Sequence, residues 1–290
     1  MHAFDYVAAQ TVQEAVSLLA EKGDAARVLA GGTDLIVQVR EGRRSPDLII
    51  DVKHIPDTNV LSYSPQSGLT LGAAVPCHRI YGDATIAAAY PGLVDAFSLV
   101  GGMQIQGRGT VGGNLCNSSP AADTIPALIA HSAVAVIAGP SGTREVAVED
   151  FCTGPGRNVL QNGELLVSLK IPAPATGFGA CYLRFIPRNE MDIAVVGTGS
   201  SVVLSADGST IISALVALGA VGPTPITVDT SALAGQPANE VTINTAAEAS
   251  IAAASPISDM RGTVEQRRHL SGVLTRRTLQ KAIARAQGEA

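Results

Sequence analysis

Two glycine-rich segments, well separated in the chain, hold the residue types best suited to bind an anionic group. The first is Ala30-Gly31-Gly32-Thr33-Asp34-Leu35-Ile36, and the second is Thr110-Val111-Gly112-Gly113-Asn114-Leu115. Glycine allows a positive φ and a close approach of the backbone to a ligand, and successive N–H groups in such a turn form a concave anion site. Neither segment contains Lys or Arg, so N–H dipoles and hydroxyls would have to neutralise the ligand. The two segments together predict one diphosphate held from both sides.

The second segment also contains a formal dinucleotide-binding match, Gly107-Arg108-Gly109-Thr110-Val111-Gly112. Such a match indicates a Rossmann turn only where a strand precedes it and a helix follows. The next residues include Gly113-Asn114 and Ser118-Ser119-Pro120, which we expect not to begin a helix at once. No acidic residue at 127–130 is available to meet a ribose. The sequence therefore argues against a Rossmann site.

The bulk composition is that of an ordinary globular protein. The chain has 290 residues, of which 46% are hydrophobic and 16% charged, and a chain of this size buries about three quarters of its unfolded surface. Its 20 basic and 25 acidic residues give a net charge of -5, and only 3% of the residues are aromatic. Nucleic-acid binders use basic surfaces and stacking aromatic rings, so we expect no nucleic-acid partner.

The ends, apolar stretches and cysteines predict a reduced protein without a metal. The N-terminal residues lack the basic and apolar regions of a leader, and the longest apolar stretch, 211–221, is shorter than the roughly 20 residues of a spanning helix. We therefore expect a cytoplasmic protein with no membrane span. Cys77, Cys116, Cys152 and Cys181 match no zinc or iron–sulfur spacing, so we expect no metal site.

Periodicity and turn residues predict helices and strands without strict alternation. Helices are expected at about 11–22, where Thr11 and Glu14 form a capping box, and at 35–40, 80–90, 91–100, 246–254 and along a basic C-terminal segment from Arg267 to Arg285. Strands are expected at 28–30, 48–52, 69–73, 133–138, 144–148, 165–171, 180–186, 193–204 and 211–219. Residues 101–124 are predicted to form a long loop with a function. This mixture favours an α+β fold over a doubly wound α/β fold.

Three other polar features have simple structural explanations. Cys77-His78 could be a nucleophile pair, but neighbours in a strand point to opposite faces, which favours a core cysteine and a surface histidine. His131, at an expected helix end, is predicted to interact with the helix dipole rather than with a metal. The basic C-terminal helix is either a solvated face or a docking surface for another subunit.

The order and spacing of several motifs carry a family resemblance. After the two glycine-rich segments come Ser118-Ser119-Pro120-Ala121-Ala122-Asp123-Thr124-Ile125-Pro126-Ala127, then Gly163-Glu164-Leu165-Leu166, Arg188-Asn189-Glu190-Met191-Asp192-Ile193-Ala194 and Val273-Leu274-Thr275-Arg276-Arg277. With them the chain resembles, over nearly its whole length, the FAD-binding medium subunit of the xanthine dehydrogenase and carbon monoxide dehydrogenase family of molybdenum hydroxylases. Thr33-Asp34 departs from the Gly-Gly-His form common in the carbon monoxide branch.

The resemblance implies an α+β FAD-binding fold of the vanillyl-alcohol oxidase (PCMH) type. It places an FAD-binding domain at 1–176, with subdomains at about 1–55 and 56–176, and a C-terminal α+β domain of the carbon monoxide dehydrogenase flavoprotein type at 178–290. The FAD would lie between the two subdomains. The residues implied to contact it from the glycine-rich segments and their surroundings are Ala30, Gly31, Gly32, Thr33, Asp34, Leu35, Thr110, Val111, Gly112, Gly113, Asn114 and Asn117.

Three further FAD contacts are implied by the resemblance. Asp123 matches a position that bonds the adenosine ribose, although Asp is also a preferred N-cap for a helix beginning at Thr124. Leu166 matches a position packing near the flavin. Arg184 matches a basic residue close to the isoalloxazine, where a cation favours the charge of reduced flavin. A solvated strand face would also explain Arg184.

The function implied by the resemblance is that of an electron-transfer subunit with no catalytic residue of its own. Electrons from a large molybdopterin-binding subunit would cross the 2Fe-2S clusters of a small subunit, reach FAD on this chain and pass to an external acceptor. The complex would be a heterotrimer or a dimer of heterotrimers. A self-contained FAD-dependent oxidoreductase with its own small substrate is the alternative, and a cofactor-free scaffold is a third. The substrate and acceptor stay open, because the substrate site would lie on another chain.

Overall fold

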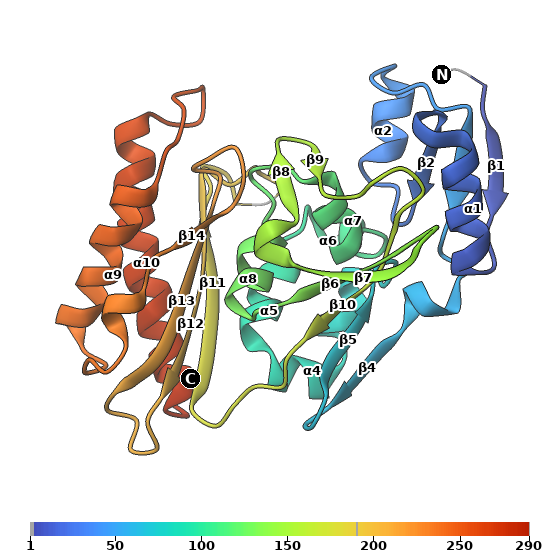
Figure 1. Ribbon diagram of the computed structural model, residues 1–290. Helices are drawn as coiled ribbons and strands as arrows, with labels where there is room; N and C mark the ends of the chain where they lie inside the picture. The colour runs from blue at the N-terminus through green and yellow to red at the C-terminus, as the bar shows by residue number, and fades with distance from the viewer. Residues whose placement is uncertain (1–2, 190, 290) are drawn as a thin grey trace.

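The protein consists of three sheet-containing units arranged in a row (Figure 1). The computed structural model describes residues 3–189 and 191–289. The N-terminal and C-terminal units lie at opposite ends of the row, and the middle unit separates them (Figure 1). Within the described part of the chain, no helix is long and apolar enough to cross a membrane.

The N-terminal unit is a three-stranded parallel sheet with β2 at one edge. Its elements are β1 (Asp5–Ala8), α1 (Val12–Lys22), β2 (Ala26–Leu29), α2 (Leu35–Arg40) and β3 (Leu48–Asp51), in the strand order β1-β3-β2. The predicted capping box opens α1, because Thr11 Oγ1 accepts from the Glu14 N–H at 3.1 Å. The Glu14 carboxylate in turn accepts from the N–H of Gln10 at 2.8 Å. Helix α1 then buries Ala15, Val16 and Leu19.

The middle unit is a five-stranded antiparallel sheet in the order β4-β5-β10-β6-β7. Its strands are β4 (Leu61–Ser64), β5 (Gly68–Gly72), β6 (Val134–Gly139), β7 (Gly142–Ala147) and β10 (Leu165–Ile171), with a small hairpin of β8 (Cys152–Gly154) and β9 (Arg157–Asn158). Its helices are α3 (Cys77–Tyr81), α4 (Ala84–Ala89), α5 (Pro91–Phe97), α6 (Met103–Gln106), α7 (Val111–Asn117) and α8 (Thr124–Ala130). Sheet residues such as Leu71 and Ile137 share one buried core with Leu128 of α8.

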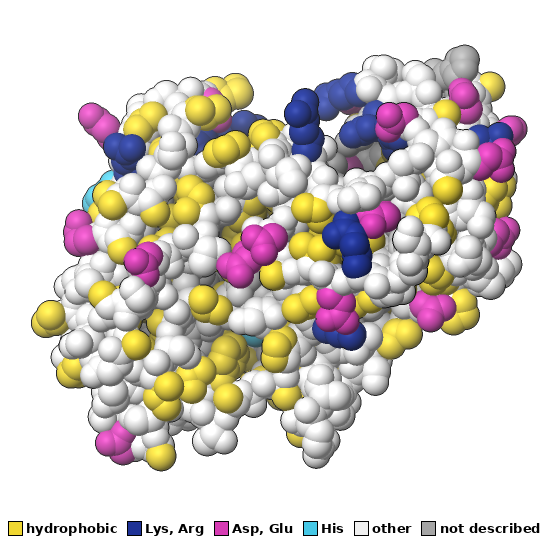
Figure 2. All heavy atoms as spheres, in the orientation of Figure 1, with side chains coloured by type: hydrophobic (Ala, Val, Ile, Leu, Met, Phe, Trp, Pro, Cys, Tyr) yellow, Lys and Arg dark blue, Asp and Glu magenta, His cyan; other side chains and the backbone are white. Residues whose placement is uncertain are grey.

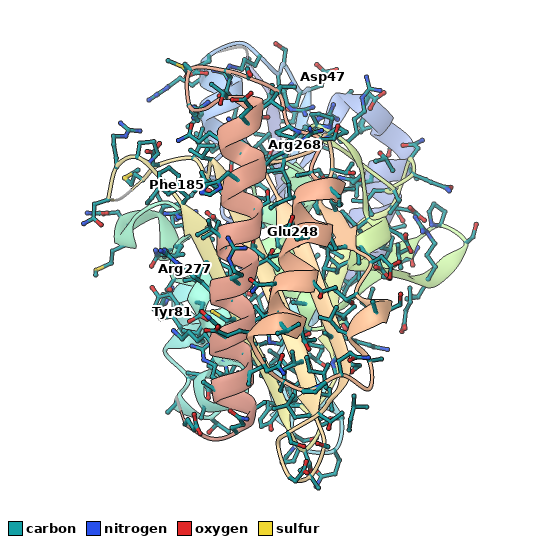
Figure 3. All side chains as sticks on the ribbon, turned by 90° about the vertical axis from the view of Figure 1, so that its left-hand side faces the viewer. Asp47, Tyr81, Phe185, Glu248, Arg268 and Arg277 are labelled. Atoms are coloured by element: carbon teal, nitrogen blue, oxygen red, sulfur yellow. The ribbon has the colours of Figure 1, made fainter. Side chains whose placement is uncertain are left out.

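The C-terminal unit is a four-stranded antiparallel sheet with both faces covered. Its elements are β11 (Phe178–Phe185), β12 (Val196–Leu204), β13 (Ile211–Gly219), β14 (Ile226–Val228), α9 (Glu240–Ala253) and α10 (Val264–Ala286). The two helices, marked by Glu248 and Arg277, lie side by side over one face (Figure 3). Helices α5 and α8 of the middle unit pack on the other face. A Cβ on Gly199 of β12 would overlap the backbone of Pro126, so glycine permits this close approach.

Most predicted elements are present, with displaced ends. The helix expected at 246–254 begins at Glu240, because the side chain of Asn239 caps it by accepting from the Thr242 N–H. The helix expected at 80–90 is divided at Asp83, whose carboxylate caps a new helix. Cys77 and His78 begin α3 rather than lying in a strand, although Cys77 is buried and His78 exposed as expected.

The prediction of a loop over 101–124 is wrong in part, because the segment contains α6 and α7. Helix α7 begins at Val111 despite the glycines that follow. Thr110 is the reason: its Oγ1 accepts from the Gly113 N–H at 2.9 Å and so caps the first turn. The rejection of a Rossmann site holds on other grounds, since α6 and not a strand precedes the match.

A partly buried ion pair joins the middle and C-terminal units. Arg285 of α10 donates through Nη1 to Asp95 Oδ2 at 2.6 Å and through Nη2 to Oδ1 at 3.0 Å. Nη1 also donates to the carbonyl of Ala180 at 2.7 Å, and Asp95 accepts from the Tyr182 N–H at 3.2 Å. The pair therefore holds α5, β11 and α10 together.

We expect Arg285→Met to lower the free energy of unfolding by about 2 kcal/mol, because it leaves the partly buried Asp95 carboxylate without its cation. Adding Asp95→Leu to that variant should restore much of the lost stability, since no unpaired carboxylate then remains. Urea unfolding of the single and double variants measures this. Strictly additive losses would contradict the expected coupling.

His131 lies where the middle and C-terminal units meet. Its ring packs between Tyr90 and Phe178, with centroid distances of 6.1 and 5.5 Å. Nδ1 lies 2.7 Å from the carbonyl oxygen of Ala127, and Nε2 has no hydrogen-bond partner. Burial lowers the pKa of His131 to about 4. The ring is therefore neutral at pH 7, and it meets the C-terminal end of α8 through the contact of Nδ1 with the Ala127 carbonyl rather than through a positive charge.

The depressed pKa of His131 predicts acid destabilisation. In the unfolded chain the histidine takes up a proton near pH 6.5, whereas the folded protein resists protonation down to about 4. The contribution of neutral His131 to the free energy of unfolding is fully present above pH 6.5, and about 2 kcal/mol of it is lost by pH 5. The variant His131→Asn should show a correspondingly smaller loss between pH 7.5 and pH 5, measured by urea unfolding. Identical pH profiles for the two proteins would refute this expectation.

Candidate functional site

The two glycine-rich segments lie against each other in the fold. The first follows β2, and the second joins α6 to α7. A Cβ on Gly31 would overlap the carbonyl oxygen of Arg108 and approach Gly109 Cα to 3.0 Å. The Arg108 Nε also donates to the carbonyl of Gly31 at 3.2 Å. The two segments therefore touch through their backbones, at a place that has no room for a side chain.

A cavity of about 770 Å³ opens at this contact, between the N-terminal and middle units. This volume lies within the usual range for cofactor sites. Lys and Arg side chains gather on the surface above the junction of α2 and the β8–β9 hairpin (Figure 2). The predicted residues that line the cavity are Ala30, Gly31, Gly32, Thr33, Asp34, Leu35, Thr110, Gly112, Gly113, Asn114, Asn117 and Leu166.

The first segment leaves β2 through a turn that requires glycine. Gly32 has a φ of 77°, and its carbonyl accepts from the Ile36 N–H at 3.1 Å as α2 begins. Asp34 is the N-cap residue of α2, but its side chain makes no capping hydrogen bond. Partial desolvation in the cavity raises the pKa of the Asp34 carboxyl. The turn thus places its own backbone and the Asp34 carboxyl group in the cavity wall.

The second segment is held by α7 and the sheet beneath it. A Cβ on Gly112 would lie 2.6 Å from Ala73 Cα, so glycine lets α7 sit directly on the strand end. The Asn114 Oδ1 accepts from Thr124 Oγ1 at 2.6 Å, which ties α7 to α8. Val111 does not line the cavity, because its side chain is buried in the core of the middle unit.

Asp123 and Arg184 form a buried pair outside the cavity lining. Arg184 Nη1 donates to Asp123 Oδ2 at 2.6 Å, and the Tyr182 hydroxyl donates to Oδ1 at 2.7 Å. Burial raises the pKa of Asp123, while the Arg184 charge and the Tyr182 hydrogen bond lower it. Asp123 makes no capping hydrogen bond, and the Arg184 side chain is only 5% exposed. The alternatives of a helix cap and a solvated strand face are therefore wrong.

The cavity also contains residues that the sequence did not single out. Arg27 of β2, Gln38 of α2 and Arg44 beyond α2 line it, together with Asn158, Leu160, Gln161 and Asn162 from the middle unit. A signal for Arg27 was available, because it stands in the strand that leads into Gly31. Arg44 carried no signal, since only the return of the chain after α2 brings it back to the cavity.

The described residues offer little for covalent or metal chemistry. Among them, no group of three or more His, Cys, Asp or Glu side chains is placed to hold a metal ion. Burial raises the pKa values of Cys77, Cys116 and Cys181 to about 12. Such thiols stay protonated and are poor nucleophiles at pH 7. The arrangement suits the binding of a cofactor.

Comparison with known families identifies that cofactor. Residues 2–174 match the model of the FAD-binding domain in molybdopterin dehydrogenase, and residues 181–282 match the CO dehydrogenase flavoprotein C-terminal domain. The chain belongs to this family. The resemblance inferred from motif order is confirmed, and so are the α+β fold and FAD as the cofactor.

Relatives match along nearly the whole chain. The carbon monoxide dehydrogenase medium chain of Afipia carboxidovorans is 32% identical over 287 residues, covering 98% of each chain. The xanthine dehydrogenase FAD-binding subunit of Escherichia coli O157:H7 is 29% identical over 287 residues, covering 98% of this chain and 97% of that protein. A chain in the crystal structure of the cyanide-inactivated Cu,Mo-CO dehydrogenase matches with a TM-score of 0.92 at 30% identity, covering 98% and 99% of the two chains.

The cavity wall fits the diphosphate of FAD. In the first turn of α7 the Gly113 N–H is donated to Thr110 Oγ1, whereas the N–H groups of Val111 and Gly112 have no partner within the helix, and Gly112 and Gly113 line the cavity. Thr33 and Thr110 add hydroxyls to the lining. Gly31 and Gly112 stand where a Cβ would meet backbone, so both segments can approach a ligand closely. The donors that the two glycine-rich segments offer carry no fixed positive charge, as in a diphosphate site built from backbone.

We expect Gly31→Ala to weaken FAD binding by at least about tenfold, because the new Cβ would overlap Arg108 and force the two segments apart. Titration of the flavin-free protein with FAD measures the dissociation constant. Gly107→Ala is a matched control, since its Cβ would meet nothing closer than 3.8 Å. Equal FAD affinities for the two variants would contradict the role of the contact.

Proposed function

We propose that this chain is the flavin-bearing electron-transfer subunit of a heteromeric molybdenum hydroxylase. The observation that carries the proposal is the cavity formed by both glycine-rich segments in a chain that belongs to an FAD-binding family. Relatives named as a medium chain and as an FAD-binding subunit support it. Bound FAD would supply the capacity to take up and release electrons. The residues that line the cavity would hold it.

The proposed FAD contacts are those in the cavity wall. Gly31, Gly32 and Thr33 would hold the diphosphate from one side, and Thr110 and Gly113 from the other. The roles predicted for Asp123 and Arg184 stay predictions. Because each is the other's partner, Arg184 would reach the isoalloxazine with its charge largely offset by the carboxylate.

The proposed complex contains two further subunits. A large subunit would bind molybdopterin and the substrate, and a small subunit would carry the 2Fe-2S clusters, in a heterotrimer or a dimer of heterotrimers. Solved relatives named as a Cu,Mo-CO dehydrogenase and a quinoline 2-oxidoreductase support such a complex. We propose a cytoplasmic location, an FAD-binding domain at 1–176 and a second domain at 178–290.

A self-contained FAD-dependent oxidoreductase is the second candidate, and one observation favours it. Such an enzyme needs a proton-transfer group beside its flavin. Asp34 is a carboxyl group in the cavity wall, and desolvation raises its pKa. A carboxyl group of this kind could exchange a proton with a bound substrate.

Purification of the tagged chain from the organism that produces it distinguishes the electron-transfer subunit from the self-contained oxidoreductase. We expect two other polypeptides to co-purify with it, with molybdenum and iron detected by elemental analysis and a flavin absorption band near that of free FAD. Carbon monoxide, xanthine and nicotinate, as probes, should bleach the flavin only in the complex. The isolated chain should bind FAD and oxidise none of them.

Two results would overturn the proposal. Turnover of an organic substrate by the isolated chain, lost on Asp34→Asn, would establish the self-contained oxidoreductase. A colourless protein that also rejects added FAD would leave only a cofactor-free scaffold. The variant Asp57→Asn, an acidic residue outside the cavity lining, is the matched control for Asp34→Asn.

A further inference from the structure

Helix α10 is basic along almost its whole length. After Glu265 it has no acidic residue up to its end at Ala286. In that stretch the basic residues are Arg267, Arg268, Arg276, Arg277, Lys281 and Arg285. None of these six lines the FAD cavity, so the proposed cofactor site does not account for them. The pattern alone is compatible with a solvated face or with a docking surface.

Two of the six arginines and lysines hold α10 in the fold. Arg267 donates through Nη1 to two backbone carbonyls and through Nη2 to Asp259 Oδ1 at 2.7 Å. Arg285 pairs with Asp95 of the middle unit. The side chains of Arg267 and Arg285 are only 5% and 12% exposed. Both therefore point toward the body of the protein and are unavailable to a partner.

Arg276, Arg277 and Lys281 form the basic face of α10. Arg277 and Lys281 are exposed, and Arg276 is half-buried. Across residues 3–189 and 191–289, none of the three forms an ion pair with a carboxylate. Thr275 faces α9 through a hydrogen bond to Ser250, so Arg277, two residues on, lies on the side of α10 away from α9 (Figure 3). The basic face thus looks outward.

Helix stability does not account for the basic face. The helix dipole stabilises cations only within the last turn, and Arg276 and Arg277 precede the end of α10 by more than two turns. A solvated helix face usually alternates acidic and basic residues at i,i+4 spacing. Arg277 and Lys281 are instead a like-charge pair at that spacing, which weakens a helix. A carboxylate supplied from outside would offset this repulsion.

A hollow of about 160 Å³ adjoins the basic face, between α9 and α10. Arg276 and Gln280 line it from α10, and Glu240, Asn244 and the buried Ile243 line it from α9. The volume is below the usual range for cofactor sites and suits a single side chain. Glu240 stands on the Arg276 side, so the charge on the far flank of α10 is the less compensated.

The basic face is remote from the FAD cavity. Helices α9 and α10 cover one face of the C-terminal sheet, and α5 and α8 of the middle unit cover the other. The cavity lies beyond them, between the middle and N-terminal units (Figure 1). A protein bound to α10 would therefore touch no residue of the cavity wall. Such a contact would attach a partner without delivering electrons to FAD.

We propose that the basic face of α10 docks an acidic segment of another subunit of the complex, with carboxylates on Arg277 and Lys281 and one side chain in the hollow beside Arg276. The inference rests on the proposed function, because it requires a heteromeric complex. Charge complementarity points to an acidic protein surface. Nucleic acid fits less well, because only 3% of the chain is aromatic and its net charge is -5.

Carbodiimide cross-linking of the purified complex, followed by mass spectrometry, tests the contact directly. The reagent joins an amine to a carboxylate that touches it. We therefore expect the Lys281 amine to be linked to an Asp- or Glu-rich peptide of another subunit. Lys281→Arg keeps the positive charge and removes the amine, so the link should vanish while the complex stays intact.

A triple variant tests the contribution of the charges. Arg276→Gln, Arg277→Gln and Lys281→Gln together should weaken binding of that subunit to the immobilised full chain at least about tenfold in 0.15 M salt. The FAD content per chain and the urea midpoint should stay unchanged, because the basic face lies outside the cavity lining and forms no ion pair within the fold.

The combination of Lys22→Gln, Arg43→Gln and Lys170→Gln is the matched control. It removes the same number of positive charges from exposed side chains elsewhere on the surface, each of them paired with a glutamate. None of the three lines the cavity. Binding of the subunit should stay within about twofold of the wild-type value.

Four results would overturn the proposal. They are equal weakening in the two triple variants, undiminished binding in the first of them, a Lys281 link to a second copy of this chain, and release of nucleic acid or lipid in place of a subunit. A wild-type chain that co-purifies with no other polypeptide would instead refute the proposed function, and this inference with it.

Discussion

The backbone contact between Gly31 and the Arg108-Gly109 turn is the constraint on which the cofactor site depends. It brings together an edge strand of the N-terminal unit and a helix cap of the middle unit, and the cavity opens beside it. A side chain at Gly31 has no space there. Because the contact is between backbones, both segments can offer N–H groups to one ligand, as a diphosphate flanked by two glycine turns requires.

Packing elsewhere in the fold holds the two glycine-rich segments in contact. Helix α7 rests on the middle sheet through Gly112, and α8 ties to it through the Thr124 hydroxyl. The same α8, with α5, covers the far face of the C-terminal sheet, and the Asp95–Arg285 pair closes that junction. A covered sheet without exposed faces gives the C-terminal unit a fixed position relative to the FAD site. Electron transfer needs this rigidity, because donor and acceptor must keep their separation.

Local sequence signals predicted helices and strands well where the residues responsible lie only a few positions apart in the sequence. The Thr11 capping box and the strand expected at 48–52, observed at Leu48–Asp51, follow such signals. The prediction failed at α7, because glycine-rich composition opposed a helix that the Thr110 cap and packing on Ala73 stabilise. It also missed α6 and the division at Asp83. Short helices held by tertiary packing leave weak periodicity.

The residues of the two glycine-rich segments by themselves predicted a bound diphosphate, since glycine, threonine and asparagine supply the donors and the backbone freedom that it needs, and the family resemblance carried by motif order implied FAD. It also predicted the part of the cavity wall that the two glycine-rich segments form. Tertiary structure alone decided that Asp123 and Arg184 pair with each other, that His131 is neutral and that Arg27 and Arg44 line the same cavity. The physical reason is that charge pairing, burial and desolvation depend on which residues are close in space. Residues far apart in the sequence carry no local signal that they will come into contact.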